Sequence, residues 1–202
     1  MEQLQTENSA AGGLSDLTDV LGFPPVLDAC CGTRMFWFNK HDERALFADK
    51  RQGTRIIDVG TPGTIGRTPK VVAPDVLQDF TAMNIPDNTF WHVVFDPPHF
   101  HKGAGATGRI AFDFGLLPDN WRDMLRDGFA ECFRVLKPHG TLIFKWCEAE
   151  IPLREVLALT PEKPLYGHRS GKKAQTHWIA FMKPNAELTG AALAQRPGRA
   201  PG

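Results

Sequence analysis

Four consecutive residues, Asp96-Pro97-Pro98-His99, join an acid, two prolines and a flat ring directly after the apolar run 91–95. Proline fixes its own φ and has no N–H, so the turn after the acid is rigid and its carbonyls are free to accept hydrogen bonds. An acid and a carbonyl held in this way at the end of a strand can grip an exocyclic NH2 on a planar molecule. The motif therefore predicts an amino-binding site.

A second segment, residues 25–33, runs from a short apolar strand into a turn of an acid and small residues, Pro25-Val26-Leu27-Asp28-Ala29-Cys30-Cys31-Gly32-Thr33. Together the two segments resemble motifs of the S-adenosylmethionine-dependent amino-methyltransferases. Members of that class carry Asp-Pro-Phe-Cys-Gly-Ser-Gly after the first strand and Asp-Pro-Pro-Tyr after the fourth. The resemblance extends over about residues 22–183, and both motifs stand in the order that this fold requires.

Three positions depart from the family pattern. Cys30 replaces the common phenylalanine, Arg34 stands where a glycine is usual, and His99 stands where the family has tyrosine, phenylalanine or tryptophan. The Arg34 side chain either points outward or closes on the carboxylate of the cofactor, and the sequence leaves both open. An imidazole can stack on a base as the larger rings do, but it also titrates; Phe100 is a second candidate for stacking.

The glycine turn after the first strand is the expected cofactor site, because ligands of open α/β sheets bind beyond the carboxyl ends of the strands. Gly32 lets the backbone approach the methionine part of the cofactor, Asp28 faces its ammonium, and Cys30 lies between them. Asp49, ending the second expected strand, is placed for the ribose diol. The resemblance implies that Asp79 takes the adenine amino group. Each acid also has a structural reading, as a cap, a member of a charged stretch or the start of a turn.

The resemblance implies methyl transfer to an aromatic amine at the Asp96 turn. The Asp96 carboxylate and the Pro97 carbonyl would each accept one N–H, so that the nitrogen becomes pyramidal and aims at the sulfonium methyl. Lys102, in the loop after His99, and Lys172, in a local basic stretch, would contact substrate phosphates. A solvated hairpin tip explains Lys172 equally well. The structural alternative for the whole motif is a rigid turn that ends a buried strand.

Other chemistries fit less well. None of the four cysteines lies in a Pro-Cys pair, which argues against a covalent attack on cytosine. His99 and His101 have no third ligand at convincing spacing, so no metal is expected. The segment 170–173 lacks both the leading glycine and the following Ser or Thr of a phosphate loop.

The elements that must position these residues alternate along the chain. We expect strands over 26–29, 45–49, 71–77, 90–95, 141–146 and 177–182, with 164–166 as a hairpin partner of the last, helices over 121–136 and 151–159, and a loop over 53–68 that holds at most a short strand at 56–59. This order predicts an α/β fold, Rossmann-like, with a mostly parallel seven-stranded sheet, one antiparallel strand and helices on both faces.

Length and composition bound the organisation. A chain of 202 residues forms one substantial domain, here expected over 22–183, between flexible tails at 1–21 and 184–202. The formal net charge is zero, so no global field draws the protein to nucleic acid. Four cysteines without a disulfide pattern, and no apolar segment of membrane-spanning length, favour a cytoplasmic protein.

The resulting hypothesis is methyl transfer from S-adenosylmethionine to an exocyclic nitrogen of a nucleobase, with adenine N6 in DNA preferred over RNA. The chain has little room for a target-recognition region. The enzyme would therefore have low sequence specificity, rely on a protein partner, or act on single-stranded or structured nucleic acid, where flipping the base costs less. The alternatives are a methyltransferase for an RNA base or a protein glutamine, and a non-catalytic module that binds the cofactor.

Overall fold

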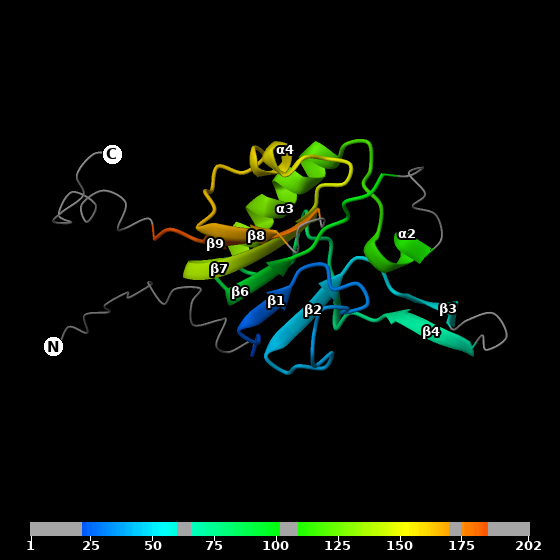
Figure 1. Cartoon of the computed structure of the whole chain (residues 1–202). Coiled ribbons are helices and arrows are strands. Elements are labelled where there is room, and N and C mark those ends of the chain that lie inside the picture. Colours follow the sequence, from blue (N-terminus) through cyan, green and yellow to red (C-terminus); the bar gives the residue numbers. More distant parts are fainter. Residues whose placement is uncertain (1–21, 60–65, 102–108, 170–174, 186–202) are drawn as a thin grey trace, which may run out of the picture.

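The structure, a computed structural model, describes residues 22–59, 66–101, 109–169 and 175–185. Its centre is a seven-stranded sheet in the spatial order β5-β2-β1-β6-β7-β9-β8, and β3 and β4 form a separate two-stranded sheet (Figure 1). The strands are β1 (Val26–Asp28), β2 (Ala45–Asp49), β3 (Gly53–Val59), β4 (Gly66–Val72), β5 (Val76–Leu77), β6 (Phe90–Phe95), β7 (Leu136–Cys147), β8 (Tyr166–Arg169) and β9 (Thr176–Met182).

The direction of the strands gives the sheet one functional edge. β5, β2, β1, β6 and β7 run parallel, and β9 runs antiparallel to both of its neighbours. From β1 the chain moves outward to β2 and β5 and then returns to β6 on the other side of β1, so strand order reverses between β1 and β6. Ligands of such sheets bind beyond the carboxyl ends at this reversal. The expected parallel sheet with one antiparallel strand is confirmed.

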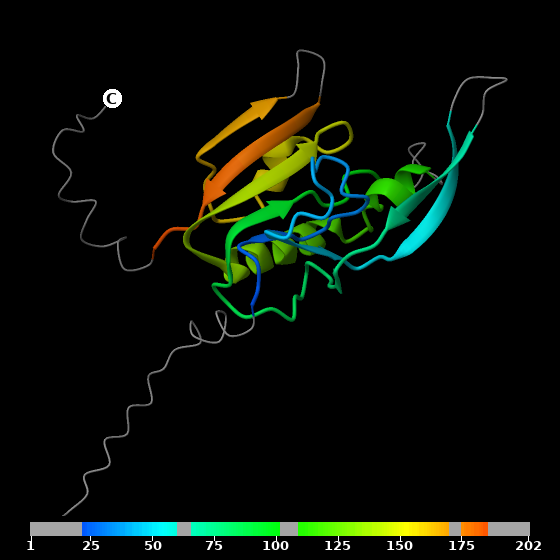
Figure 2. The same cartoon turned by 90° about the horizontal axis from the view of Figure 1, so that it is seen from below.

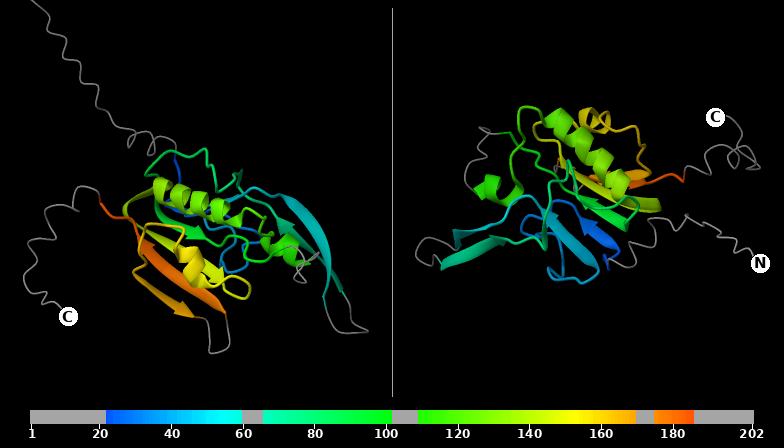
Figure 3. Two further views of the ribbon diagram at one scale, coloured as in Figure 1. Left: turned by 90° about the horizontal axis from the view of Figure 1, so that it is seen from above. Right: turned by 180° about the vertical axis from the view of Figure 1, so that it is seen from behind.

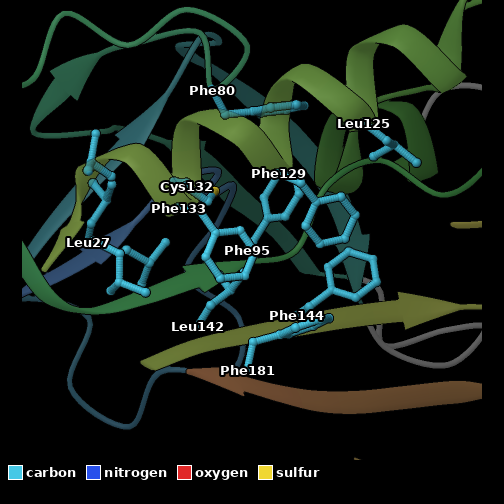
Figure 4. Close-up of a cluster of buried hydrophobic side chains, with 14 of the residues drawn as sticks. Leu27, Phe80, Phe95, Leu125, Phe129, Cys132, Phe133, Leu142, Phe144 and Phe181 are labelled. Atoms are coloured by element: carbon cyan, nitrogen blue, oxygen red, sulfur yellow. The ribbon is translucent and has the colours of Figure 1, made fainter. Parts of the chain in front are cut away.

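Aromatic side chains from several elements form the core on one face of the sheet. Phe95 on β6 lies at its centre, with its ring 5.2 Å from Phe80, 5.5 Å from Phe129 and 5.7 Å from Phe144, centroid to centroid (Figure 4). All four side chains are buried. Edge-to-face and tilted contacts of this kind add to the free energy of burial, and they fix β6 and therefore the position of Asp96.

Three helices are described: α2 (Arg109–Phe114), α3 (Trp121–Val135) and α4 (Leu153–Leu157). α3 and α4 lie on the same face of the sheet, whereas α2 lies beyond the carboxyl ends of the strands (Figures 1 and 3). None of these helices is long and apolar enough to span a membrane.

The opposite face carries a loop in place of a helix. The chain from residue 29 to 44 crosses it as a succession of turns (Figure 2). Phe36 and Trp37 from this loop line a recess of about 240 Å³ with His92, Val94 and side chains of β7 and β9. Within the described residues, helices therefore cover one face of the sheet, as expected. Aromatic side chains of a loop cover the other face, where helices were also expected.

Gly128 lets α3 approach β6 closely, and this contact makes a testable prediction. A Cβ atom at this position would lie 2.8 Å from Phe95 Cζ and 2.9 Å from Phe80 Cδ2. We expect Gly128→Ala to lower the free energy of unfolding by about 1–2 kcal/mol, because overpacking outweighs the gain in helix propensity. Urea unfolding monitored by circular dichroism measures the change. Ala130→Gly, at an exposed position of the same helix, supplies the propensity term alone; an unchanged or higher stability of Gly128→Ala would contradict the tight contact.

The segment expected as a loop over 53–68 differs most from the sequence prediction. It forms the antiparallel β3–β4 hairpin, with Gly53 paired to Val72 and Val59 to Gly66. The hairpin projects from the body of the protein near α2 (Figures 1 and 2). The strand expected over 71–77 is consequently divided between the end of β4 and the short β5, and only β5 joins the main sheet.

Candidate functional site

The turn that follows β1 is built for a close backbone approach. Gly32 has a φ of 50°, a conformation that glycine adopts without strain. Its N–H donates to Asp49 Oδ2 over 2.9 Å, and the Cys31 N–H donates to the Ala48 carbonyl over 2.8 Å. These bonds tie the turn to the end of β2, so the two expected cofactor segments form one unit.

Asp49 is buried, and a neighbouring cation already engages its carboxylate. Arg51 Nε lies 3.0 Å from Oδ1 and Arg51 Nη2 lies 3.0 Å from Oδ2. The same guanidinium donates to the Phe112 carbonyl of α2 over 3.0 Å. Arg51 thus links the ribose-binding candidate to the helix beyond the strand ends, and ribose hydroxyls would share this carboxylate with it.

Removing Arg51 is expected to destabilise the protein. Its partner Asp49 has a side chain only 3% exposed, whereas Arg51 is 30% exposed, so Arg51→Met leaves a buried carboxylate without its cation. We expect the free energy of unfolding to fall by about 2 kcal/mol, below the range for a fully buried pair. Arg44→Met is the matched control, because Arg44 pairs in the same way with Asp42 but is 80% exposed, so its loss should change the free energy of unfolding little. Equal losses in the two variants would contradict this reading.

Asp28 is fully buried at the end of β1. Trp37 Nε1 donates to its Oδ2 over 2.7 Å, and the Cys30 N–H donates to its Oδ1 over 3.3 Å. Burial raises the pKa of Asp28 to about 7, and these hydrogen bonds only partly oppose that shift. Near neutral pH the carboxyl therefore exists in both protonation states.

The Asp96 turn lies beside this unit, at the end of β6. Lys145 Nζ is 2.5 Å from Asp96 Oδ2, and the side chains are 15% and 9% exposed. The second oxygen, Oδ1, is buried and has no hydrogen-bond partner in the described part of the chain. A buried acceptor without a donor is costly, so this oxygen is the strongest candidate in the site for receiving a ligand N–H.

His99 is buried rather than displayed. Its ring lies 4.5 Å from Phe100, 5.8 Å from Phe114 and 6.0 Å from Trp146 between centroids, and its Nδ1 lies 3.2 Å from the Pro97 carbonyl. Burial lowers the pKa of His99 below its ordinary value, so the ring is neutral at pH 7. A base that stacks on His99 would have to displace Phe100 or Phe114.

One cavity joins the two turns. It is lined by Cys30, Gly32, Asp49, Asp96 and Pro98, and segment 113–116 covers it. A Cβ at Gly32 would lie 3.0 Å from the Asp113 carbonyl, and one at Gly115 would lie 2.9 Å from the Pro98 ring. The cavity measures about 90 Å³, whereas small-molecule sites usually measure about 300–1,000 Å³. The donor set fits a nucleoside cofactor, and segment 113–116 must lie further away when one binds.

The remaining expected residues lie at different distances from this cavity. Asp79 follows β5 and accepts from the Thr81 N–H and hydroxyl; partial burial raises its pKa, but these bonds and Lys50 outweigh that effect and lower it. Its neighbour Phe80 lines the cavity. Burial raises the pKa of Cys30 well above its ordinary value, so it is a neutral thiol. Lys102 and Lys172 lie outside the described residues.

The structure answers the question left open for Arg34. Its side chain is buried, stacks over Phe47 at 3.8 Å and bonds to the Ala73 carbonyl and Asp75, away from the cavity between the two turns. Within the described ranges, no three His, Cys, Asp or Glu side chains lie close enough to hold a metal ion.

Sequence reasoning missed Arg51 and Lys145. For Phe36 and Trp37 it offered a cover over the cofactor pocket or a place in the core, but not the bond from Trp37 to Asp28. Arg51 was visible only as part of a charged stretch. Lys145 had a clear signal, since it is the one charge within the otherwise uncharged strand stretch 141–147. A lone cation at the end of an apolar strand, next to a strand that ends in an acid, indicates a buried ion pair.

No protein-family model and no curated protein sequence matches the chain. Among solved structures, the PH0226 protein from Pyrococcus horikoshii is 15% identical with a TM-score of 0.49, and the match covers 85% of this chain and 88% of the other. The 1,6-didemethyltoxoflavin-N1-methyltransferase of Burkholderia thailandensis, solved with S-adenosylhomocysteine, is also 15% identical, with a TM-score of 0.45 and coverage of 85% and 76%.

A predicted O-methyltransferase from Agrobacterium tumefaciens is 16% identical, with a TM-score of 0.34 over 54% of this chain and 47% of the other. All three TM-scores are below 0.5, so the fold assignment rests on the order and direction of this chain's own strands.

Proposed function

We propose that the protein transfers a methyl group from S-adenosylmethionine to an exocyclic amino nitrogen of a nucleobase, with adenine N6 in DNA preferred. The observation that carries the proposal is the shared cavity, in which the Gly32 turn and the Asp96 carboxylate face one space. A donor bound at the first lies next to an acceptor gripped at the second. Proximity and orientation of this kind supply a large part of the barrier reduction in group transfer.

The cofactor, when bound, supplies a methyl group on a cationic sulfur. Gly32 gives its backbone room, Asp49 offers oxygens to the ribose, and Asp28 stands near the amino-acid part. Asp79 follows the neighbouring strand, in reach of the adenine end. Of these three acids, Asp49 lines the cavity in the described part of the chain.

Asp96 acts on the acceptor. An aromatic amine is a poor nucleophile, because its lone pair is delocalised into the ring. Oδ1 accepts one N–H and the Pro97 carbonyl accepts the other, which favours a pyramidal nitrogen with its lone pair toward the methyl group. After transfer the nitrogen carries an extra proton, which passes to Asp96 or to water.

The proposed substrate class rests on the Asp-Pro-Pro turn. The turn resembles that of the amino-methyltransferases acting on DNA, although similar turns serve RNA bases and protein glutamines. A flipped or single-stranded base costs less to insert into such a site. We therefore propose a nucleic-acid substrate, DNA more than RNA, with a protein partner supplying target recognition.

Two measurements test the proposal. Calorimetry should detect S-adenosylmethionine binding to the full chain, and the absence of heat at high protein concentration would remove the methyltransferase reading together with that of a non-catalytic cofactor module. Transfer of tritiated methyl groups onto double-stranded DNA, single-stranded DNA, RNA and total protein then assigns the acceptor. Label on protein alone would mean that the acceptor is a protein side chain such as glutamine and not a nucleobase. Binding without transfer to any acceptor would favour the non-catalytic module.

A further inference from the structure

Lys145 stands out among the residues that the proposed reaction does not yet use. It lies on β7 with a side chain only 15% exposed, and its ammonium contacts Asp96. Lys145 pairs directly with Trp178 across β7 and β9, while the preceding Phe144 pairs with Phe95 across β6 and β7. Strand pairing on both sides therefore fixes its backbone beside the carboxylate.

Two aromatic rings confine the ammonium as well. Lys145 Nζ lies 5.7 Å from the centroids of both Phe36 and Trp178, and these rings meet edge to face at 5.5 Å. Cation–π attraction at such distances favours a cation in this position. The ammonium is thus held from three sides, by two rings and one carboxylate.

The charges around Asp96 explain why a cation is needed there. Burial raises the pKa of Asp28, and the nearby Asp96 and Asp49 raise it further. Arg51 pairs with Asp49 and the Trp37 N–H bonds to Asp28. In the described part of the chain, Lys145 is the cation that pairs with Asp96, so its removal would leave a buried acidic side chain without an oppositely charged partner.

We propose that Lys145 is a positioning residue for methyl transfer: it occupies Asp96 Oδ2 and so presents Oδ1 to the acceptor nitrogen. This inference rests on the proposed function. A carboxylate can rotate about its Cβ–Cγ bond and offer either oxygen, but a charge-assisted hydrogen bond to Oδ2 removes that freedom. Oδ1, buried and without a partner in the described residues, is then the oxygen left for the amine N–H. The other N–H of the amine is left for the Pro97 carbonyl.

The test compares three variants of the full chain in the tritiated-methyl assay. Lys145→Met keeps much of the length but removes the charge, and it should lower kcat about 10²-fold, the usual cost of a misplaced catalytic group. The Kd for S-adenosylmethionine, measured by calorimetry, should change by less than about threefold, since the lost interaction acts on the acceptor. Lys145→Arg keeps the charge and should retain more activity than Lys145→Met.

Chemical rescue separates positioning from a structural role. Lys145→Ala leaves space between Phe36 and Trp178, and added ethylammonium should restore kcat in a saturable way. Tetramethylammonium at the same ionic strength carries charge but no N–H, so it should not. Rescue by neither ion, or equally by both, would overturn the proposal.

A remote ion pair supplies the structural control. Arg134 on α3 binds Glu131 and Asp87, none of which lines the cavity between the two turns, so Arg134→Met should lower stability without changing kcat. If Lys145→Met keeps the wild-type kcat while Asp96→Asn is inactive, the positioning role is wrong and the proposed reaction stands. If the wild-type protein labels no acceptor, the proposed function fails and this inference fails with it. Should Lys145→Met not fold, Lys145→Arg and the rescued Lys145→Ala decide.

Discussion

Replacing Asp96 by asparagine is expected to reduce methyl transfer about 10²–10³-fold, the scale on which single preorganised hydrogen-bonding groups act. Asparagine keeps the shape of the side chain but exchanges one oxygen for an NH2. That donor then faces either the Lys145 ammonium or the acceptor amine, and both are donors themselves. The ion pair is lost in both orientations; in one the amine loses its acceptor, and in the other the Lys145 ammonium loses its acceptor.

The measurement for Asp96→Asn is a single-turnover assay with saturating S-adenosylmethionine. Cofactor binding should persist, because the Gly32 turn and Asp49 are unchanged. Asp127→Asn removes an exposed carboxylate of α3 and should match the wild-type protein. Wild-type turnover by Asp96→Asn would place the chemistry elsewhere in the molecule.

Replacing Asp28 by asparagine should change how stability depends on pH. The pKa of Asp28 rises from 3.8 to about 7 on folding, chiefly through burial. The folded state therefore binds a proton at this carboxyl that the unfolded state has lost. The stabilisation is fully present below pH 3.8 and is lost as pH rises through about 7.

Asparagine does not titrate, so the variant does not lose stability through this group as pH rises. We expect the free energy of unfolding of Asp28→Asn, relative to the wild-type protein, to improve by about 4 kcal/mol between pH 4 and pH 8, at about 1.36 kcal/mol per unit of pKa shift. Urea unfolding at a series of pH values gives the difference, and Asp127→Asn provides the baseline for an exposed carboxyl. A difference that stays constant across this range would show that Asp28 is not desolvated in the folded protein.

Local patterns predicted the parts of the fold that local physics controls. β6 is an apolar run bounded by turn residues, and α3 carries its apolar side chains at helical spacing; both form where expected. The Gly32 and Asp96 turns also follow their strands as expected, because turn residues directly follow each apolar run. Their meeting in one cavity follows from parallel strands whose carboxyl ends share an edge.

The β3–β4 hairpin was not predicted, because amino-acid composition does not determine whether two extended segments pair. Its residues are rich in Gly, Thr and Pro, which are typical of loops, yet an antiparallel ladder requires only extended backbones with free N–H and C=O groups. Pro69 lies opposite Ile56 in this two-stranded hairpin, where each strand has a free edge and a missing N–H is tolerated.

The contacts that tune the site could not be read from spacing. Lys145 and Asp96 are 49 residues apart in the sequence, so spacing does not identify them as partners, although the lone charge of Lys145 in stretch 141–147 indicates an ion pair. His99 has the flat ring expected of a stacking residue, but Phe100 and Phe114 cover it. Which face of a ring remains open depends on segments that fold over it, and these have no fixed distance from the motif.

The contacts of segment 113–116 with the Gly32 turn and Pro98 also affect how fast a ligand can bind and leave. A ligand that binds beneath this segment cannot arrive faster than the segment departs, so at high concentration its observed association rate should reach a plateau. Release obeys the same limit. The opening frequency of these backbone contacts would then set an upper limit on turnover.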